Sequence, residues 1–289
     1  MPPEKIHVHW TYSGGGFGRR LLADFVAQAV VLSKAVQRPV KVVWTREQDM
    51  THDFYRPATL TRIAAALDAQ GMPTAIAARL VSATQLALVS PAPLPANVDP
   101  RCTEGLEETR YGVANFRLDY NKPELAVPTS VLRTTGFGPN IFALETFIDE
   151  LAHAAGADPY GYRRALLQHD ARALKVLDLA AERSENLQGG AIWGLTSAMK
   201  SEITFAKGGT VQENFGDYDV VHLWEAPAIN EVHLLEGNRD SPGEQKIGGL
   251  GEVGPTGIPP AFANALFAAT GERLRTLPLL RHGYSFAQD

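Results

Sequence analysis

Three short stretches of this 289-residue chain carry the residue types that bind ligands or move protons. The first reads GGGFGRR and contains Gly15, Gly16, Phe17, Gly18 and Arg19. Glycines let the backbone approach a ligand closely and point N–H groups at it, and the N-terminus of a following helix favours an anion. The stretch therefore predicts a turn around an anionic cofactor, although a tight strand-to-helix turn without any ligand would have the same pattern.

The glycine turn matches only part of the fingerprint of a dinucleotide site. That fingerprint is GxGxxG, and here Gly16 and Gly18 are followed by Arg19, Arg20 and Leu21 without the third glycine. A nicotinamide-dependent dehydrogenase therefore rests only on the order of a strand, a glycine turn and a helix. It is the weakest of the functions considered.

The second and third stretches each place one charged side chain beside glycines. Arg133 stands before Gly136 and a long helical pattern, and a guanidinium at such a turn can hold a phosphate or another oxyanion. Glu252 follows Gly251 in the loop GGLGEVGP, where burial would raise its pKa and suit it to general-base catalysis. The alternatives are a surface arginine beside a turn and a solvated loop glutamate.

The apolar pattern predicts the elements that must position these residues. Helices are expected over residues 24–37, 141–155, 158–167, 171–183 and within 185–199, and from Pro259 and Pro260 to Gly271. Strands are expected over residues 5–10, 40–44, 201–205, 210–215 and 232–236, with two more between residues 58 and 82. Gly156 is expected to end one helix and Asp158 to cap the next.

Helices and strands are mixed without the strict alternation of a doubly wound sheet. The sequence therefore predicts an α+β fold in which mixed sheets pack against helices. The character of the chain changes after Ser184, which divides it into two portions. Residues 1–184 contain the glycine turn and Arg133, and residues 185–289 contain Glu252.

Composition excludes several classes of protein. Hydrophobic residues make up 45% and charged residues 20%, as in a globular chain with a sizeable core, and the net charge of -5 gives no basic surface for nucleic acid or an anionic membrane. Cys102 is the only cysteine, which excludes an internal disulfide. No apolar run has the length of a transmembrane helix, and the first residues lack the pattern of a signal peptide. We expect a soluble protein, in the cytoplasm or the periplasm.

Six motifs run in one order over nearly the whole chain: GGGFGRR at residues 14–20, REQDMTHDFYRPA at 46–58, FALETFIDELAHAAGADP at 142–159, LQGGAIWGL at 187–195, ENFGDYDV at 213–220 and GGLGEVGPTGIPPAFANALFAATG at 248–271. On these motifs the chain resembles the large molybdenum-binding subunit of the xanthine oxidase superfamily. It is most similar to the branch that contains the isoquinoline 1-oxidoreductase beta subunit and related aldehyde dehydrogenases.

The resemblance implies a fold, a reaction, a cofactor and partners. Members hydroxylate an aldehyde or an N-heterocycle with oxygen from water, and electrons leave through iron–sulfur clusters on a partner, here a small iron–sulfur subunit. It implies that Glu252 is the catalytic base and that Phe17 and Arg133 lie near the molybdenum. It also implies molybdopterin, in its cytosine dinucleotide form, held by Gly15, Gly16, Phe17, Gly18, Arg19, Arg133, Gly136 and Gly251.

Two departures from the family pattern affect what is expected. Leu21 stands where purine-oxidising relatives carry a glutamate, so an aldehyde or an apolar N-heterocycle is the expected small-molecule substrate and xanthine is not. The long N-terminal half of family subunits has no counterpart here, and neither has a stretch beyond Ser184. The expected fold is therefore an incomplete molybdopterin-binding domain that needs a companion chain for activity. The alternative is a non-catalytic truncated remnant that acts at most as a binding module.

Overall fold

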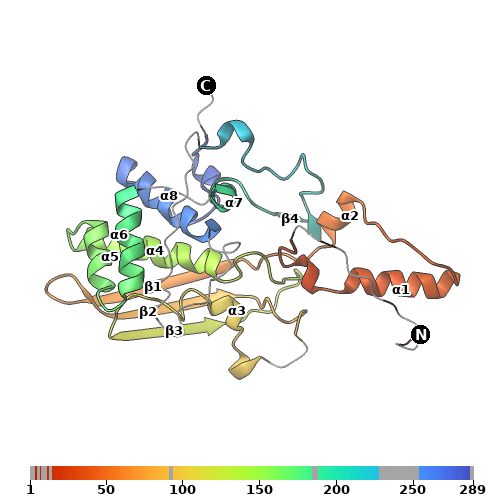
Figure 1. Cartoon of the computed structure of the whole chain (residues 1–289), viewed down its shortest axis with the longest axis horizontal. Helices are drawn as coiled ribbons and strands as arrows, with labels where there is room; N and C mark the ends of the chain where they lie inside the picture. Colours follow the sequence, from red (N-terminus) through yellow and green to blue (C-terminus); the bar gives the residue numbers. More distant parts are fainter. Residues whose placement is uncertain are drawn as a thin grey trace.

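The computed structural model describes residues 4, 7, 12, 15–90, 94–183, 188–227 and 254–286 of the chain. The expected α+β fold is confirmed, because packed helices accompany one three-stranded mixed sheet and one small two-stranded sheet. Figure 1 shows a broad body, which contains β1–β3, α4–α6 and α8, and a narrower region beside it that carries α1 and α2.

The larger sheet has the strand order β1-β2-β3. β1 (Thr59–Leu67) and β2 (Pro73–Ser82) are antiparallel, and β3 (Asn115–Asn121) runs parallel to β2. Asp68 closes the turn between β1 and β2 by accepting two backbone N–H hydrogen bonds (2.9 and 2.8 Å), and Gly71 supplies a φ of +78°. The two strands predicted between residues 58 and 82 are confirmed, whereas β3 has no counterpart among the predicted strands.

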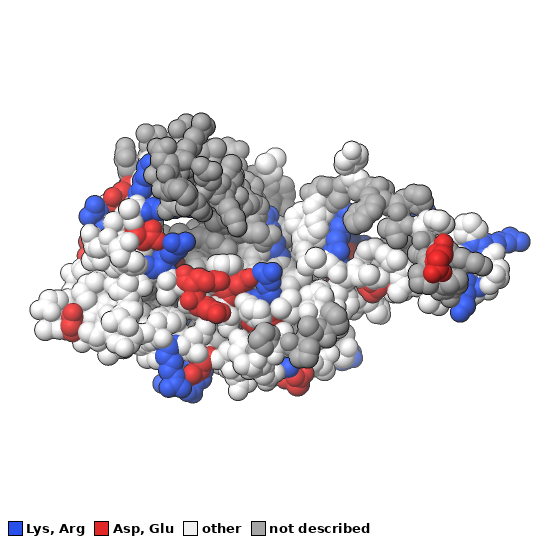
Figure 2. Space-filling model, turned by 60° about the horizontal axis from the view of Figure 1, so that its bottom comes forward, with Lys and Arg blue, Asp and Glu red and all other residues white. Residues whose placement is uncertain are grey.

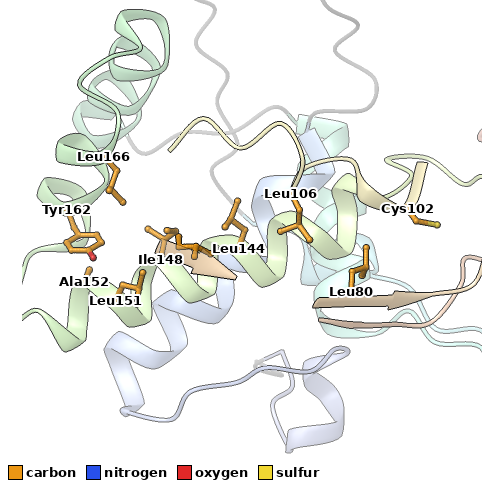
Figure 3. Close-up of a cluster of buried hydrophobic side chains, with 10 residues drawn as sticks. Leu80, Cys102, Leu106, Leu144, Ile148, Leu151, Ala152, Tyr162 and Leu166 are labelled. Atoms are coloured by element: carbon orange, nitrogen blue, oxygen red, sulfur yellow. The ribbon is translucent and has the colours of Figure 1, made fainter. Parts of the chain in front are cut away.

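The main hydrophobic core lies between this sheet and α4 (Phe137–Ala154), as Figure 3 shows. Its buried members are Ile76, Leu80, Cys102, Leu106, Leu144, Ile148, Leu151, Ala152, Tyr162 and Leu166. Leu144, Ile148 and Leu151 follow the spacing of one helix face, as the sequence predicts. Each large apolar side chain buried in this way stabilises the fold by about 1.5–3 kcal/mol.

The end of α4 and the beginning of the next helix lie at the residues predicted to stop and to cap them. Gly156 adopts a φ of +64° beyond the end of α4, and Asp158 caps α5 (Pro159–Leu166) by accepting a hydrogen bond from the N–H of Gly161 at 2.7 Å. α6 (Ala171–Arg183) follows over its predicted span. Other short helical elements are α3 (Pro100–Thr103), η3 (Pro95–Asn97), η4 (Leu223–Glu225) and η5 (Leu279–His282).

Two helices of the C-terminal portion pack against each other. α7 (Gln188–Met199) confirms the helix predicted there, and α8 (Gly254–Thr270) packs against both α7 and α4. A second cluster of buried side chains closes the end of this pair and consists of Leu195, Met199, Leu274 and Leu279. The contact between α8 and α4 joins the two predicted portions of the chain, whose division at Ser184 stays a prediction.

The predicted start of α8 is wrong. Pro259 and Pro260 lie inside the helix, which begins at Gly254. A proline inside a helix removes a backbone hydrogen bond and normally breaks the helix. Here the first turn of α8 lies directly against α7, and this tertiary packing keeps the residues before the prolines helical.

The region that we call the arm comprises residues 15–54 and contains η2 (Arg19–Leu21), α1 (Asp24–Val36) and α2 (Arg46–Thr51). α1 confirms the predicted helix, but none of its residues is buried. In Figure 1 the arm lies on the opposite side of the molecule from α5 and α6.

Several predicted strands are wrong or reduced. Residues 40–44 have no regular secondary structure, and no hydrogen bond between described residues uses their backbone groups. A strand is held by hydrogen bonds to a neighbouring strand, and residues 40–44 make none of these with described residues. The other strand predicted in this region, at residues 5–10, lies almost entirely outside the described residues. The strands predicted at residues 201–205 and 210–215 shrink to β4 (Phe205–Ala206) and β5 (Gly209–Thr210), which pair as a short hairpin. Residues 232–236 lie outside the described part.

Charged side chains of both signs are distributed over the face shown in Figure 2. An acidic group near the middle of that face borders basic side chains, and the described residues form no broad basic area on it. Within the described ranges, no helix is both long enough and apolar enough to cross a lipid bilayer.

Candidate functional site

The backbone of the glycine turn is strongly bent. The φ angles are +148° at Gly15, +51° at Phe17 and +94° at Gly18, and a positive φ is unusual for phenylalanine. Among the hydrogen bonds between described residues, none uses the N–H of Gly16, Phe17 or Gly18. Successive N–H groups in such a turn form a concave site for an anion.

Gly18 brings the glycine turn against the second predicted loop. A Cβ atom at Gly18 would lie 2.0 Å from the carbonyl oxygen of Val131 and 3.0 Å from the Cα of Leu132. No side chain can occupy this position, so the glycine permits the close approach of two protein backbones. The chain thereby places the glycine turn beside the residues that lead into Arg133.

The loop that carries Arg133 has a strained backbone. Thr134 and Thr135 have φ angles of +75° and +41°, which are rare for β-branched residues. The guanidinium of Arg56 holds this conformation by donating hydrogen bonds to the carbonyl oxygens of Arg133 and Thr135 and to Oγ1 of Thr134. The hydroxyl of Thr135 also donates to the carboxylate of Glu104. The position of Arg133 is thus fixed by contacts from several parts of the chain.

Gly136 begins α4 at a point of close packing. A Cβ atom there would lie 2.5 Å from the carbonyl oxygen of Arg101 and 2.8 Å from that of Cys102. The close approach of α3 leaves no room for a side chain and explains why residue 136 is a glycine. The contact of Gly136 with a cofactor stays a prediction.

Arg19 is held inside the arm by acidic and aromatic neighbours. Its guanidinium forms a two-pronged ion pair with Asp24 (2.8 and 2.9 Å) and a further ion pair with Asp53 (2.8 Å). It also lies 5.4–5.6 Å from the ring centres of Phe25, Trp44 and Phe54. The hydrogen bond from Arg19 lowers the pKa of Asp24, whereas burial raises the pKa of Asp53 despite the same neighbour. The contact of Arg19 with a cofactor stays a prediction.

Trp193 on α7 meets both predicted loops. Its indole ring lies parallel to the ring of Phe17, with 6.2 Å between the ring centres and 8° between the planes. The guanidinium carbon of Arg133 lies 5.4 Å from the centre of the Trp193 ring. One side chain from the C-terminal portion therefore contacts both Phe17 and Arg133.

Glu252 and Gly251 lie outside the described residues. Gly254, the first described residue after them, is packed against α7, because a Cβ atom at Gly190 would lie 2.8 Å from its Cα. A Cβ atom at Gly194 would likewise lie 2.8 Å from the carbonyl oxygen of Pro255. α7 therefore packs against the start of α8 through Gly190 and Gly194, and the same helix carries Trp193.

Two residues of this site had no predicted role. Arg56 and Trp193 both fall in motifs of the resemblance, REQDMTHDFYRPA and LQGGAIWGL. Their contacts with residues far away in the sequence cannot be read from local spacing. Leu21 lies in η2 and is 66% exposed, so the position noted for substrate preference is open to solvent.

The arm contains a shallow hollow of about 450 Å³ that is separate from this cluster. It is lined by Asp24, Gln28, Val42, Val43, Trp44, Gln48 and His52. None of the predicted site residues lines it. Within the described residues, no group of three His, Cys, Asp or Glu side chains is placed to hold a metal ion.

Comparison with known proteins establishes the class of this chain. Residues 1–167 match the model of the molybdopterin cofactor-binding domain, which is more than half of the chain, and the chain belongs to this family. More particularly, its relatives confirm the resemblance to molybdenum-binding subunits of the xanthine oxidase superfamily.

Two curated relatives illustrate this similarity. Isoquinoline 1-oxidoreductase subunit beta of Brevundimonas diminuta is 27% identical over 345 residues, which cover 96% of this chain and 43% of the relative. The membrane-bound aldehyde dehydrogenase [pyrroloquinoline-quinone] of Gluconacetobacter polyoxogenes is 25% identical over 366 residues, which cover 96% of this chain and 46% of the relative. The chain spans less than half the length of these relatives. Both alignments are longer than the 289-residue chain, so the relatives carry residues opposite gaps in it.

Among solved structures, the crystal structure of quinoline 2-oxidoreductase from Pseudomonas putida 86 is similar to this chain, with a TM-score of 0.49 and 22% sequence identity. The similar region covers 59% of this chain and 24% of that structure.

Proposed function

We propose that the chain forms part of a molybdenum hydroxylase that oxidises an aldehyde or an N-heterocycle. The observation that carries this proposal is the match of residues 1–167 to the molybdopterin cofactor-binding domain, together with the meeting of its two loops at Gly18 and Trp193. The names of the two relatives, which specify isoquinoline and aldehyde oxidation, support the class of substrate.

The described residues are compatible with molybdopterin. A Cβ atom at Gly16 would meet only the side chain of Arg20, at 3.5 Å or more, so a ligand can approach this backbone closely. The N–H groups of Gly16, Phe17 and Gly18 can donate to anionic oxygens, and Arg133 adds a positive charge. In the proposed complex, Gly15, Arg19, Gly136 and Gly251 also contact the cofactor, in its cytosine dinucleotide form. When bound, this cofactor supplies the redox chemistry of the molybdenum centre.

The proposed role of Glu252 is that of the general base. Its carboxylate takes a proton from the oxygen that will be transferred, and a general base of this kind contributes about a hundredfold to ten-thousandfold to the rate. Gly251 and Gly254, the first and last residues of the sequence GEVG, allow a close approach of the backbone. Phe17 and Arg133 border the reacting centre, where the aromatic ring excludes water and the guanidinium balances negative charge.

The substrate and partners complete the proposal. Leu21 offers no hydrogen bond to a purine, which favours an aldehyde or an apolar N-heterocycle. Electrons pass to iron–sulfur clusters on a small partner subunit.

A specific observation supports a second candidate, a non-catalytic remnant of such a subunit. The relatives carry residues opposite gaps in this chain. From the resemblance to the family, we expect one such gap beyond Ser184. Loss of strands or loops there would remove ligands to the cofactor. In this case the chain would act at most as a binding module.

Metal and pterin analysis separates the two candidates. The chain is purified from a molybdenum-replete host together with the products of neighbouring genes, and molybdenum and pterin are measured per polypeptide. Near-stoichiometric molybdenum supports the hydroxylase, and a stable complex without molybdenum or pterin supports the remnant. In a loaded complex, Glu252→Gln is expected to abolish turnover and leave the molybdenum content unchanged. Turnover close to that of the wild type would remove Glu252 from the role of base.

A further inference from the structure

We propose that Trp193 is a positioning residue that holds the side chains of Phe17 and Arg133 at the molybdopterin site. This inference rests on the proposed function and adds a third stretch of chain, α7, to the two loops predicted from the sequence. Gly18 and Val131 join the backbones of those loops, and Trp193 contacts one side chain from each loop.

The contacts of the indole ring support this role. Phe17 lies parallel to it, 6.2 Å between ring centres, and the Arg133 guanidinium carbon lies 5.4 Å from its centre. Offset aromatic pairs at this separation are attractive, and so is a guanidinium within about 6 Å of a ring centre. Phe17 is 52% exposed and Trp193 is 38% exposed, so the rest of the fold covers these rings only partly. The more exposed ring, that of Phe17, gains a partner in the ring of Trp193.

The helix that carries Trp193 is itself firmly packed. Gly190 and Gly194 allow α7 to approach α8 at Gly254 and Pro255, and Leu195 on α7 is 6% exposed. A side chain on a fixed helix can hold partners on loops more precisely than those loops can hold each other. The arrangement thus transfers the rigidity of the α7–α8 pair to Phe17 and Arg133.

The alternative is that Trp193 only fills space between the arm and the body. The two roles differ in what they require of a replacement. Filling space needs apolar volume, which leucine and phenylalanine both provide. Holding Arg133 by its positive charge needs an aromatic face, which phenylalanine provides and leucine does not.

Chemical modification of Arg133 tests this difference on the chain without cofactor. The rate at which phenylglyoxal modifies each arginine is followed by peptide mass spectrometry. Arg110 (side chain 74% exposed) and Arg163 (13% exposed) serve as internal references for an open and a covered guanidinium. We expect Trp193→Leu to raise the rate at Arg133 by about fivefold, and Trp193→Phe to raise it by less than about twofold.

Equal rates in the leucine and phenylalanine variants, or an unchanged rate in the leucine variant, would overturn the proposal. A raised rate at Arg163 would reveal general loosening of the fold, and Trp193→Met, with a longer, unbranched and flexible side chain that fills irregular gaps, then replaces the leucine variant under the same criteria. Trp224→Ala is the matched control, because Trp224 is 81% exposed and stacks on His222 at 4.5 Å. It is expected to leave the rate at Arg133 unchanged.

Molybdenum content provides the second measurement. In the complex with its partners, Trp193→Leu is expected to lower molybdenum per polypeptide severalfold, while Trp193→Phe and Trp224→Ala retain it. If the Trp193→Leu complex retains its full molybdenum content, the proposal that Trp193 positions residues for the cofactor is overturned. If the wild-type complex holds no molybdenum but the modification rates change as expected, the proposed function fails while the contact of Trp193 with Arg133 stands.

Discussion

α4 and α1 are both apolar helices, but only α4 is covered by the rest of the chain. α4 buries residues along its whole length, among them Ile148 at 0% exposed. α1 buries none, and Val31 and Val36 are 65% and 54% exposed. The comparison indicates that apolar packing determines the position of α4, whereas α1 is joined to the rest of the arm by polar and cation–π contacts around Arg19.

The candidate site lies where these two regions meet. Gly136 starts α4 on the covered side, and the glycine turn leads into α1 on the uncovered side. Gly18 packs against Val131, and Phe17 stacks on Trp193, across this boundary. A cofactor bound here would contact one well-packed region and one region with little apolar packing of its own.

The largest expected effect separates the two helices by stability. Ile148→Ala should lower the free energy of unfolding by about 2–5 kcal/mol, because it leaves a cavity in the main core. Val31→Ala on α1 should change it by less than about 0.5 kcal/mol, since an exposed side chain loses little packing. Urea denaturation monitored by circular dichroism measures both. Similar losses in the two variants would mean that α1 is covered in solution.

The next effect concerns the contact that crosses the boundary. Gly18→Ala should cost about 2 kcal/mol or more, because the methyl group meets the Val131 carbonyl and φ is +94°. Gly16→Ala is the matched control in the same turn, since its methyl group would have room beside Arg20. Thermal denaturation of both variants checks this expectation. If Gly16→Ala lowers the stability as much as Gly18→Ala does, the loss results from any substitution in the turn and not from the contact of Gly18 with Val131.

A smaller effect should appear as a pH dependence of the arm. The hydrogen bond from Arg19 lowers the pKa of Asp24 below its ordinary value of 3.8. The stability that this pair contributes is therefore present above the ordinary pKa and is lost as the pH falls through the lowered one. Hydrogen exchange of α1 peptides, corrected for the intrinsic rate at each pH, should accelerate below about pH 4.

The control for this experiment is Asp24→Asn, which cannot titrate. Its α1 peptides should exchange faster than those of the wild type at neutral pH and show a weaker acceleration on acidification. Burial raises the pKa of Asp53, which opposes part of the effect because protonation of that carboxyl favours the folded arm. Wild-type and variant curves of the same shape would exclude the Arg19–Asp24 pair as the cause.

The smallest expected change in stability follows a substitution on the exposed face of α1. Its measurable effect is on the association of chains with one another. Uncovered apolar side chains favour contacts between molecules. We expect the isolated chain to associate as its concentration rises, and Val31→Glu to reduce this association with almost no change in unfolding free energy. Light scattering coupled to size-exclusion chromatography measures it, with Val31→Ala as a control for side-chain size. Identical profiles for wild type and Val31→Glu would argue against α1 as the contact surface.

The elements that could be predicted are those with strong local signals. The stripe of α4, the stop at Gly156 and the cap at Asp158 follow from periodicity and from residues next to each other. Residues 40–44 have the composition of a strand, yet strand pairing depends on a neighbour that local sequence does not specify. The start of α8 was missed for the same reason, because packing against α7 overrides the two prolines.

The candidate site was predictable in its parts and only partly in its assembly. Glycines beside Phe17 and Arg133 indicated two loops, and the structure brings these loops together at Gly18. The contacts of Arg56 and Trp193 were not predictable, since they join residues that are distant in the sequence. Glu252 lies outside the described residues, and its role stays a prediction.

The long sequence separation of these contacts has a consequence for the order of folding. Arg56 binds the loop of Arg133 across 77–79 residues, and Phe17 meets Trp193 across most of the chain. Contacts that close such long loops form late, because the entropy lost on closure must be offset by structure already in place. During synthesis, the contact between Phe17 and Trp193 can therefore form only after α7 has emerged from the ribosome. A cofactor whose binding requires this contact can be inserted only after that point.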